Sequence, residues 1–183
     1  MRKIHYMVRS LLTKLIGGRE PDLFIGGRDK PYLLRWYVIP RNKFFNIYYH
    51  RFMQSDTAEA LHDHPWLFNM SYLLLGEYTE FVPLNGEPLL STPILRNEGA
   101  IKFRWGKSPH RVELYRRAKA VAPDDDVTPI TITNIEIPVD TLFITGPIVR
   151  KWGFYCPKGW KPWEQFLDRY DSPRENIRSE GCG

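Results

Sequence analysis

Two of the five histidines in the chain, His62 and His64, stand two residues apart in the segment LHDHPW, residues 61–66. On a β-strand, residues two apart point to the same face, so both imidazoles would project together while Asp63 points the other way. Two neighbouring imidazoles can chelate a metal ion, but two ligands make a weak site. Taken alone, such a pair is more often a polar turn than a metal site, so a third ligand decides the interpretation.

His110 is the candidate third ligand, because it begins the strand-like run HRVELY. In an antiparallel sheet or barrel, a strand distant in sequence can bring it opposite the pair. Three neutral imidazoles with open coordination positions suit zinc, iron or another transition metal. The sequence therefore predicts a metal site formed by His62, His64 and His110.

The elements that must position these residues are short strands. From residue 32 onward, segments rich in β-branched and aromatic residues alternate with turn-prone pieces such as PLNGEP and WGKSP. Many short strands without helical stretches between them predict an all-β antiparallel sandwich or barrel. We expect a barrel over residues 30–162, an amphipathic helix within residues 1–18, and a short helix followed by a polar tail over residues 163–183.

The N-terminal helix is indicated by apolar residues at spacings of three and four over residues 2–16, which places them on one face. Gly17 and Gly18 then end the helix. Such a helix can lie on a membrane surface, but covering one side of a small domain is the interpretation we prefer. We find no secretory signal, and no apolar run approaches the ~20 residues that a membrane-spanning helix needs.

Composition fits one globular domain: 43% of the 183 residues are hydrophobic and 14% are aromatic. The net charge of +5 is uneven, since residues 1–51 carry eleven Lys/Arg against three Asp/Glu, a balance of +8. A basic N-terminal third of the chain can attract nucleic acid, anionic lipid or an anionic substrate, but a solvated basic face is the simpler explanation. Cys156 and Cys182 do not make a disulfide framework, so we expect reduced thiols in a cytoplasmic protein.

The histidines stand in a frame that resembles the cupin superfamily. Its first motif has the shape G-x5-H-x-H-x(3–4)-E-x6-G, and its second has the shape G-x5-P-x-G-x2-H-x3-N. The matching positions in this chain are His62, His64, Gly76, Gly99 and His110. The resemblance implies a cupin-like double-stranded β-helix, or jelly roll, with a divalent metal at the three histidines.

The resemblance covers residues 56–114 and has departures. Asn69 occupies the slot where the family usually has a metal-binding glutamate. Its amide oxygen could bind weakly, or it could only form hydrogen bonds nearby. The other replaced positions are Asp56, Trp105, Lys107 and Leu114. The site then looks like the three-histidine variant of the cupin thiol dioxygenases, or like a barrel that has lost its metal.

Other groups could serve the site. Glu77 and Glu80 could act as a general base or as a partner of a metal ligand if they point inward, although glutamates at strand ends are more often solvated. His50 and Arg51 occupy opposite faces of one strand, so only one of them faces inward. His50 could join the site, or Arg51 could hold a carboxylate or phosphate by a fork of hydrogen bonds.

The tryptophan-rich residues 150–166 could stack on nucleobases or form a homodimer contact. We favour a packing role in which they close the end of the barrel and fix the last helix.

Three functions fit these features. The first, which we prefer, is an Fe(II)-dependent oxygenase whose small anionic substrate balances the charge of the ion. The second is a redox-neutral isomerase, lyase or hydrolase that uses zinc, nickel or manganese as a Lewis acid. The third is a non-enzymatic barrel that binds a small molecule, nucleic acid or protein.

Overall fold

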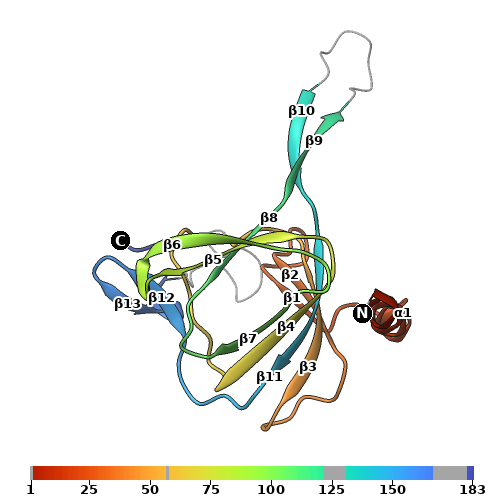
Figure 1. Cartoon of the computed structure of the whole chain (residues 1–183), viewed down its shortest axis with the longest axis horizontal. Coiled ribbons are helices and arrows are strands. Elements are labelled where there is room, and N and C mark those ends of the chain that lie inside the picture. The colour runs from red at the N-terminus through yellow and green to blue at the C-terminus, as the bar shows by residue number, and fades with distance from the viewer. Residues whose placement is uncertain (1, 57, 122–130, 167–180) are drawn as a thin grey trace.

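The computed structural model describes residues 2–56, 58–121, 131–166 and 181–183, which form an antiparallel β-barrel with one helix at each end of the chain (Figure 1). The elements follow in the order α1 (Arg2–Ile16), β1 (Leu23–Ile25), β2 (Leu33–Tyr37), β3 (Asn46–Phe52), β4 (Phe68–Leu75), β5 (Tyr78–Leu84), β6 (Glu87–Arg96), β7 (Ile101–Trp105), β8 (Arg111–Leu114), β9 (Arg116–Val121), β10 (Thr131–Glu136), β11 (Val139–Thr145), β12 (Gly153–Cys156), β13 (Gly159–Pro162) and α2 (Trp163–Phe166). The predicted cupin-like all-β architecture, with an N-terminal helix and a short C-terminal one, is confirmed.

Two sheets form the barrel. The larger has the strand order β1-β2-β3-β11-β4-β7 and the smaller has the order β6-β5-β8. The late strand β11 pairs antiparallel with both β3 and β4, so strands far apart in sequence become neighbours. β1 begins before the predicted barrel start at residue 30 and pairs with β2. The β9–β10 hairpin projects away from the barrel (Figure 1).

Strand alternation separates the two faces of the larger sheet. His50 on β3 and Phe143 on β11 point into the barrel and stack with ring centroids 5.0 Å apart. Tyr49, one residue from His50, points outward instead, where it packs with Trp36 and with Ile16 of α1. A one-residue change of register would exchange these two sets, so the pairing of β3 with β11 decides which side chains line the interior.

α1 covers part of the outer face of the larger sheet, as we preferred from its sequence. Val8, Leu12 and Ile16 pack against the sheet, and the His5 ring meets the Tyr72 hydroxyl at 2.7 Å. The apolar side of α1 is wider than its contact with the sheet, because other large apolar side chains of the helix remain exposed. Among the described residues, no helix has the length and hydropathy needed to cross a bilayer.

The expectation of reduced thiols is wrong. Cys156, at the end of β12, is bonded to Cys182, with Cα atoms 5.3 Å apart. β13 and α2 lie between the two cysteines in sequence, and Phe154 of β12 stacks on Phe166 of α2 beside the bridge. The rest of the predicted C-terminal helix and most of the polar tail fall in residues 167–180, outside the described residues.

The close approach of residues 64–67 to the end of β7 requires glycine at position 106. The Gly106 N–H donates to the Leu67 carbonyl at 3.0 Å, and its own carbonyl accepts the His64 N–H at 2.9 Å. A Cβ atom added to Gly106 would lie 1.8 Å from the Trp66 carbonyl oxygen. The two backbone segments could not keep their distance with any larger residue.

We therefore expect Gly106→Ala to lower the free energy of unfolding by at least about 3 kcal/mol, because backbone atoms rather than a side chain must move. The control is Gly86→Ala, in the β5–β6 turn, where an added Cβ meets no atom within 4 Å and only the positive φ of 83° is unfavourable. That change should cost about 1 kcal/mol. Urea denaturation of both variants measures the difference, and equal losses would contradict the close approach.

Candidate metal centre

The backbone at His62 pairs with the backbone at His110. Each donates its N–H to the carbonyl of the other at 3.0 Å, forming an isolated antiparallel bridge. With the His64–Gly106 hydrogen bond, this bridge aligns residues 62–64 alongside residues 106–110. The pairing brings the histidine of the second motif beside the pair of the first, as the sequence predicted.

The three imidazoles point to the same side and converge. Their centroids are 5.1 to 5.2 Å apart. One nitrogen from each of His62, His64 and His110 lies within 4.8 Å of the others, and the Nε2 atoms of His64 and His110 are 2.8 Å apart. Residues two apart on an extended segment share a face, which is why the first two rings point together.

The arrangement suits a divalent ion. Nitrogens bound at about 2.1 Å to one ion lie roughly 3.0–3.4 Å from each other. The three donors lie within 4.8 Å of one another, and one pair is 2.8 Å apart, so they are close enough to share one ion. Imidazole is a ligand that zinc, iron, nickel and copper all accept. His62, His64 and His110 would therefore hold the ion, and their identity alone does not select among these metals.

The electrostatics keep two of these ligands in the form that binds metal. The pKa of His110 is lowered to about 4, mainly by burial and then by the charge of Arg104, while Glu80 opposes the change. Burial also lowers the pKa of His64 well below its usual value, helped by the neighbouring histidines. Both rings are therefore neutral at pH 7, with lone pairs available for coordination.

Glu80 supports His110 from behind. Its side chain on β5 is fully buried, and Oε1 lies 3.4 Å from Nδ1 of His110. Arg96 donates to Oε2 at 2.8 Å, and the Arg104 guanidinium donates to Oε1. Burial alone raises the pKa of this carboxyl, but His110 and Arg104 outweigh it and hold the pKa well below its usual range. A carboxylate at Nδ1 favours the tautomer whose Nε2 faces the metal.

Asp56 has a similar position behind His62. Its Oδ2 lies 3.9 Å from His62 Nδ1 and accepts the Val112 N–H at 2.6 Å, while its Oδ1 accepts the hydroxyl of Tyr32. The match to the cupin motif identified Asp56 only as the residue in place of the first glycine, and it missed this position behind His62. A carboxylate six residues before a histidine ligand was the available signal.

Asp63 fixes the segment from the face opposite the imidazoles. It is fully buried and accepts hydrogen bonds from the Gly153 N–H at 2.8 Å, from Arg150 at 2.6 Å and from Trp160 Nε1 at 3.2 Å. The tryptophan-rich segment thus anchors the histidine segment through a charged hydrogen-bond network.

The other expected site residues are placed differently. Arg51 lies on the outer face of β3, where its fork of donors binds Asp140 at 2.7 and 2.9 Å, so it does not reach the histidines. His50 faces the interior and is 3% exposed. Glu77 lies in the turn between β4 and β5 and is outside the three-histidine group.

Arg35 is an interior cation that the sequence did not single out. Its Nε donates to His50 Nε2 at 2.8 Å, and its guanidinium lies 4.6 Å from the centroid of the Tyr48 ring. Burial lowers the pKa of His50 well below its usual value, so the partner of Arg35 is neutral. His50 stacks on Phe143, whose ring centroid lies 6.4 Å from that of His64, so Arg35 lies on the histidine side of the interior.

Asn69 has unused hydrogen-bonding capacity. Its side chain is fully buried, and neither its amide oxygen nor its amide nitrogen has a partner among the described residues. The hydroxyls of Thr141 and Thr145, on the adjacent strand β11, are likewise buried without a partner there. Leaving such groups unsatisfied costs about 1–3 kcal/mol each, so each favours an additional hydrogen-bonding partner in the interior.

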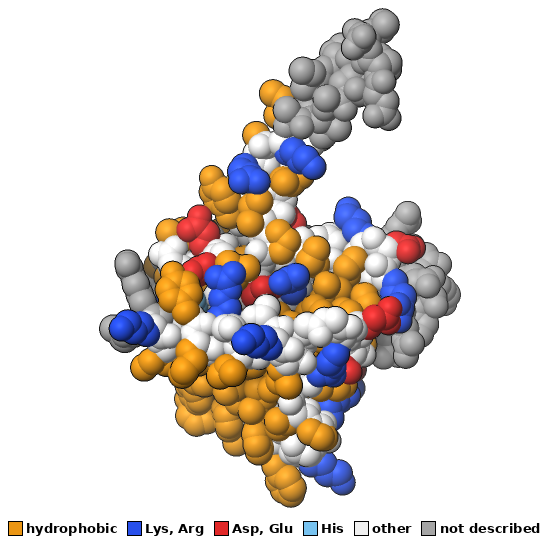
Figure 2. All heavy atoms as spheres, turned by 90° about the vertical axis from the view of Figure 1, so that its right-hand side faces the viewer, with side chains coloured by type: hydrophobic (Ala, Val, Ile, Leu, Met, Phe, Trp, Pro, Cys, Tyr) orange, Lys and Arg blue, Asp and Glu red, His pale blue; other side chains and the backbone are white. Residues whose placement is uncertain are grey.

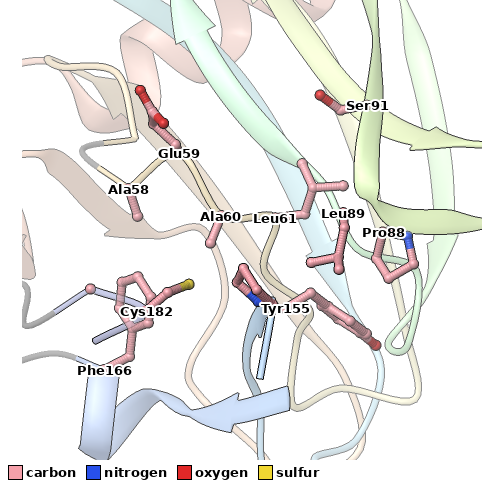
Figure 3. A pocket seen from close by; sticks show the side chains of 12 residues that line it. Ala58, Glu59, Ala60, Leu61, Pro88, Leu89, Ser91, Tyr155, Phe166 and Cys182 are labelled. Carbon is pink, nitrogen blue, oxygen red and sulfur yellow. The ribbon is translucent and has the colours of Figure 1, made fainter. Parts of the chain in front are cut away.

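A separate pocket of about 620 Å³ lies on the other side of the histidine segment (Figure 3). Leu61, Leu89, Tyr155 and the Cys182 end of the disulfide line it, and it contains no histidine. Because Leu61 precedes His62 on an extended segment, its side chain points away from the imidazoles. This pocket is therefore not the substrate side of the metal centre.

No protein-family profile and no curated protein matches the chain. Among solved structures, a cupin superfamily protein from Desulfitobacterium hafniense DCB-2 is 12% identical, with 74% of this chain and 87% of that one covered and a TM-score of 0.42. The DMSP lyase DddQ from Ruegeria pomeroyi DSS-3 is 17% identical (70% and 54% covered, TM-score 0.43). The hydroxypropylphosphonic acid epoxidase from S. wedmorenis is 12% identical (69% and 57% covered, TM-score 0.42).

The chain spans little more than half the length of the lyase and the epoxidase. The antiparallel barrel agrees with the cupin-like fold predicted from the sequence motifs. What the site can do depends on the residues of this chain.

We expect Glu80→Gln to destabilise the protein by roughly 3–5 kcal/mol, because it leaves the charges of Arg96 and Arg104 without their buried anion. Metal affinity should also fall about 10- to 100-fold. The control is Glu113→Gln on β8, whose half-exposed carboxylate lies 3.4 Å from Arg111 and should contribute less than about 1 kcal/mol. Urea denaturation and calorimetric metal titration measure both effects, and similar behaviour of the two variants would contradict the role of Glu80.

Proposed function

We propose that the protein is a metal-dependent enzyme of the oxygenase type, with Fe(II) held by His62, His64 and His110 and a small anionic molecule as substrate. The observation that carries this proposal is the convergence of the three imidazoles. Glu80 and Asp56, the carboxylates behind His110 and His62, provide the supporting contacts expected around metal ligands. Bound iron would supply the redox chemistry with dioxygen that no protein side chain provides.

The charge balance supports an anionic substrate. Three imidazoles contribute no negative charge, so an ion bound to them keeps its full 2+ charge. Arg35 adds a cation on the same side of the interior, and its hydrogen-bonding partner His50 is neutral. A carboxylate, thiolate or phosphonate would compensate both charges and accept hydrogen bonds from the guanidinium.

The side chains of the interior would divide the remaining work. Arg35 would bind and orient the anionic group, and the amide of Asn69 would form hydrogen bonds to polar substrate atoms. Glu80 would keep the proton of His110 on Nδ1. Trp66 and Phe143, whose rings lie 5.5 Å apart and each near His64, would restrict water around the reacting atoms.

The test begins with metal binding followed by turnover. Metal-free protein titrated anaerobically with Fe(II) should bind one ion per chain, and His64→Ala and His110→Ala should each lose this binding. Glu77→Ala is the control that keeps it. The iron-loaded protein is then screened for oxygen consumption over small thiols, carboxylic acids and phosphonates.

Oxygen uptake that requires both iron and one of these anions would support the proposal. Uptake no greater than that of the metal-free protein across the whole screen would overturn the oxygenase assignment. Turnover by zinc-, nickel- or manganese-loaded protein without oxygen uptake would favour the redox-neutral alternative.

For any substrate that the screen identifies, Arg35→Met should raise KM about 10- to 100-fold, because a charge-assisted hydrogen bond to the anion is lost. The effect on kcat should be smaller, since Arg35 contacts the substrate equally in the ground state and transition state. Arg41→Met removes an exposed cation from the β2–β3 connection and is the matched control. Equal KM values for the two variants would show that Arg35 does not bind the substrate.

A further inference from the structure

α1 carries two apolar stripes. Val8, Leu12 and Ile16 face the barrel, as described above. A second stripe repeats at spacings of three and four residues along the side that faces solvent. Its members and their exposed fractions are Ile4 at 63%, Met7 at 56%, Leu11 at 60% and Leu15 at 49%. A surface helix normally buries its large apolar residues, so four in one exposed stripe indicate a second contact.

The outer face of the larger sheet continues this apolar surface. The strand register aligns one row of outward side chains across β3, β11, β4 and β7, formed by Ile47, Ile144, Met70 and Phe103. α1 covers the neighbouring row, to which Tyr49 and Leu142 belong, and leaves this one open. At its margins, Trp105 is 59% exposed and Phe44 in the β2–β3 connection is 78% exposed.

The segments that form this surface carry charged side chains of one sign only. The segments that form it, residues 2–16, 38–53, 65–75, 101–105 and 141–151, contain no Asp or Glu. They contribute exposed basic residues, namely Lys3, Lys14, Arg41 and Lys43. Figure 2 shows the face that carries α1, with hydrophobic side chains gathered in its lower half, Lys and Arg mainly above them and along the right-hand edge, and acidic side chains in the upper half and at the right-hand edge.

The acidic side chains near the edge of the surface have basic partners. Asp140 at the start of β11 is bound by Arg51, and Glu98 lies 3.9 Å from His5. Just after α1, Asp22 lies 3.2 Å from Arg19, and Glu20 lies 3.8 Å from Arg28. None of them belongs to the apolar row or the exposed stripe of α1, so the surface is apolar at its centre and its own segments are cationic.

We propose that the exposed stripe of α1 and the adjacent sheet row form a peripheral binding surface for an anionic lipid bilayer. Apolar side chains would enter the boundary between headgroups and acyl chains, while the lysines and arginines would meet anionic headgroups. A second copy of the chain fits less well, since it would bring the same basic residues against each other. A surface contact of this kind needs no membrane-spanning helix.

The experiment is vesicle co-sedimentation of the full chain with phosphatidylcholine vesicles that contain or lack phosphatidylserine. Binding should require phosphatidylserine and weaken as salt is raised. Leu11→Glu should reduce binding more than about tenfold, because one apolar side chain is withdrawn from the membrane. Lys14→Gln should reduce binding about fivefold. The control is Leu95→Glu on β6 of the smaller sheet, where the leucine is also 60% exposed, and it should bind as the unmodified chain does.

No binding to either vesicle, or an equal loss in Leu11→Glu and Leu95→Glu, would overturn the proposal. So would light scattering that shows a dimer dissociated by Leu11→Glu in a chain that binds no lipid, because the occupant would then be a second copy. The measurement uses metal-free and metal-loaded protein alike. Its outcome is therefore independent of the function proposed for the histidines.

Discussion

The pair of backbone hydrogen bonds between His62 and His110 is the interaction on which the candidate site depends. It joins two segments 48 positions apart in the chain and fixes their register. Once that register is set, alternation along the segment places His64 beside His62 and turns Asp63 to the opposite side. The convergence of three imidazoles therefore follows from one backbone pairing.

Buried carboxylates hold this pairing from both faces. Glu80 stands behind His110 and is compensated by two arginines, whereas Asp63 holds the other face through Arg150 and the backbone of β12. A buried carboxylate is tolerated only when its hydrogen bonds are satisfied, so each has few alternative arrangements. The imidazoles are consequently oriented before any ion arrives, which lowers the entropic cost of binding one.

The sequence predicted the parts of the site that depend on local spacing. The alternation at His62 and His64, and the start of a strand at His110, are visible within a few residues, and the short apolar segments indicated the barrel. The inward position of Glu80 could not be decided, because the parity of β5 depends on the turns before it. Arg35 was missed for a related reason: its direction is set by the pairing of β2 with β3, which no local pattern fixes.

Local sequence patterns also could not predict the disulfide or the exposed apolar stripe of α1. Whether Cys156 meets Cys182 depends on how β12, β13 and α2 fold back on each other. The spacing of the apolar residues correctly predicted that they lie on one side of α1. It could not show that the sheet covers only part of that side, because the width of the contact is a property of the sheet surface.

The most direct measurement is a crystal structure of protein loaded anaerobically with Fe(II), with anomalous diffraction recorded on both sides of the iron edge. We expect a single iron peak within about 2.2 Å of one nitrogen from each of His62, His64 and His110. An iron peak bound by other residues, or three imidazoles separated with no peak between them in fully loaded protein, would contradict the metal centre.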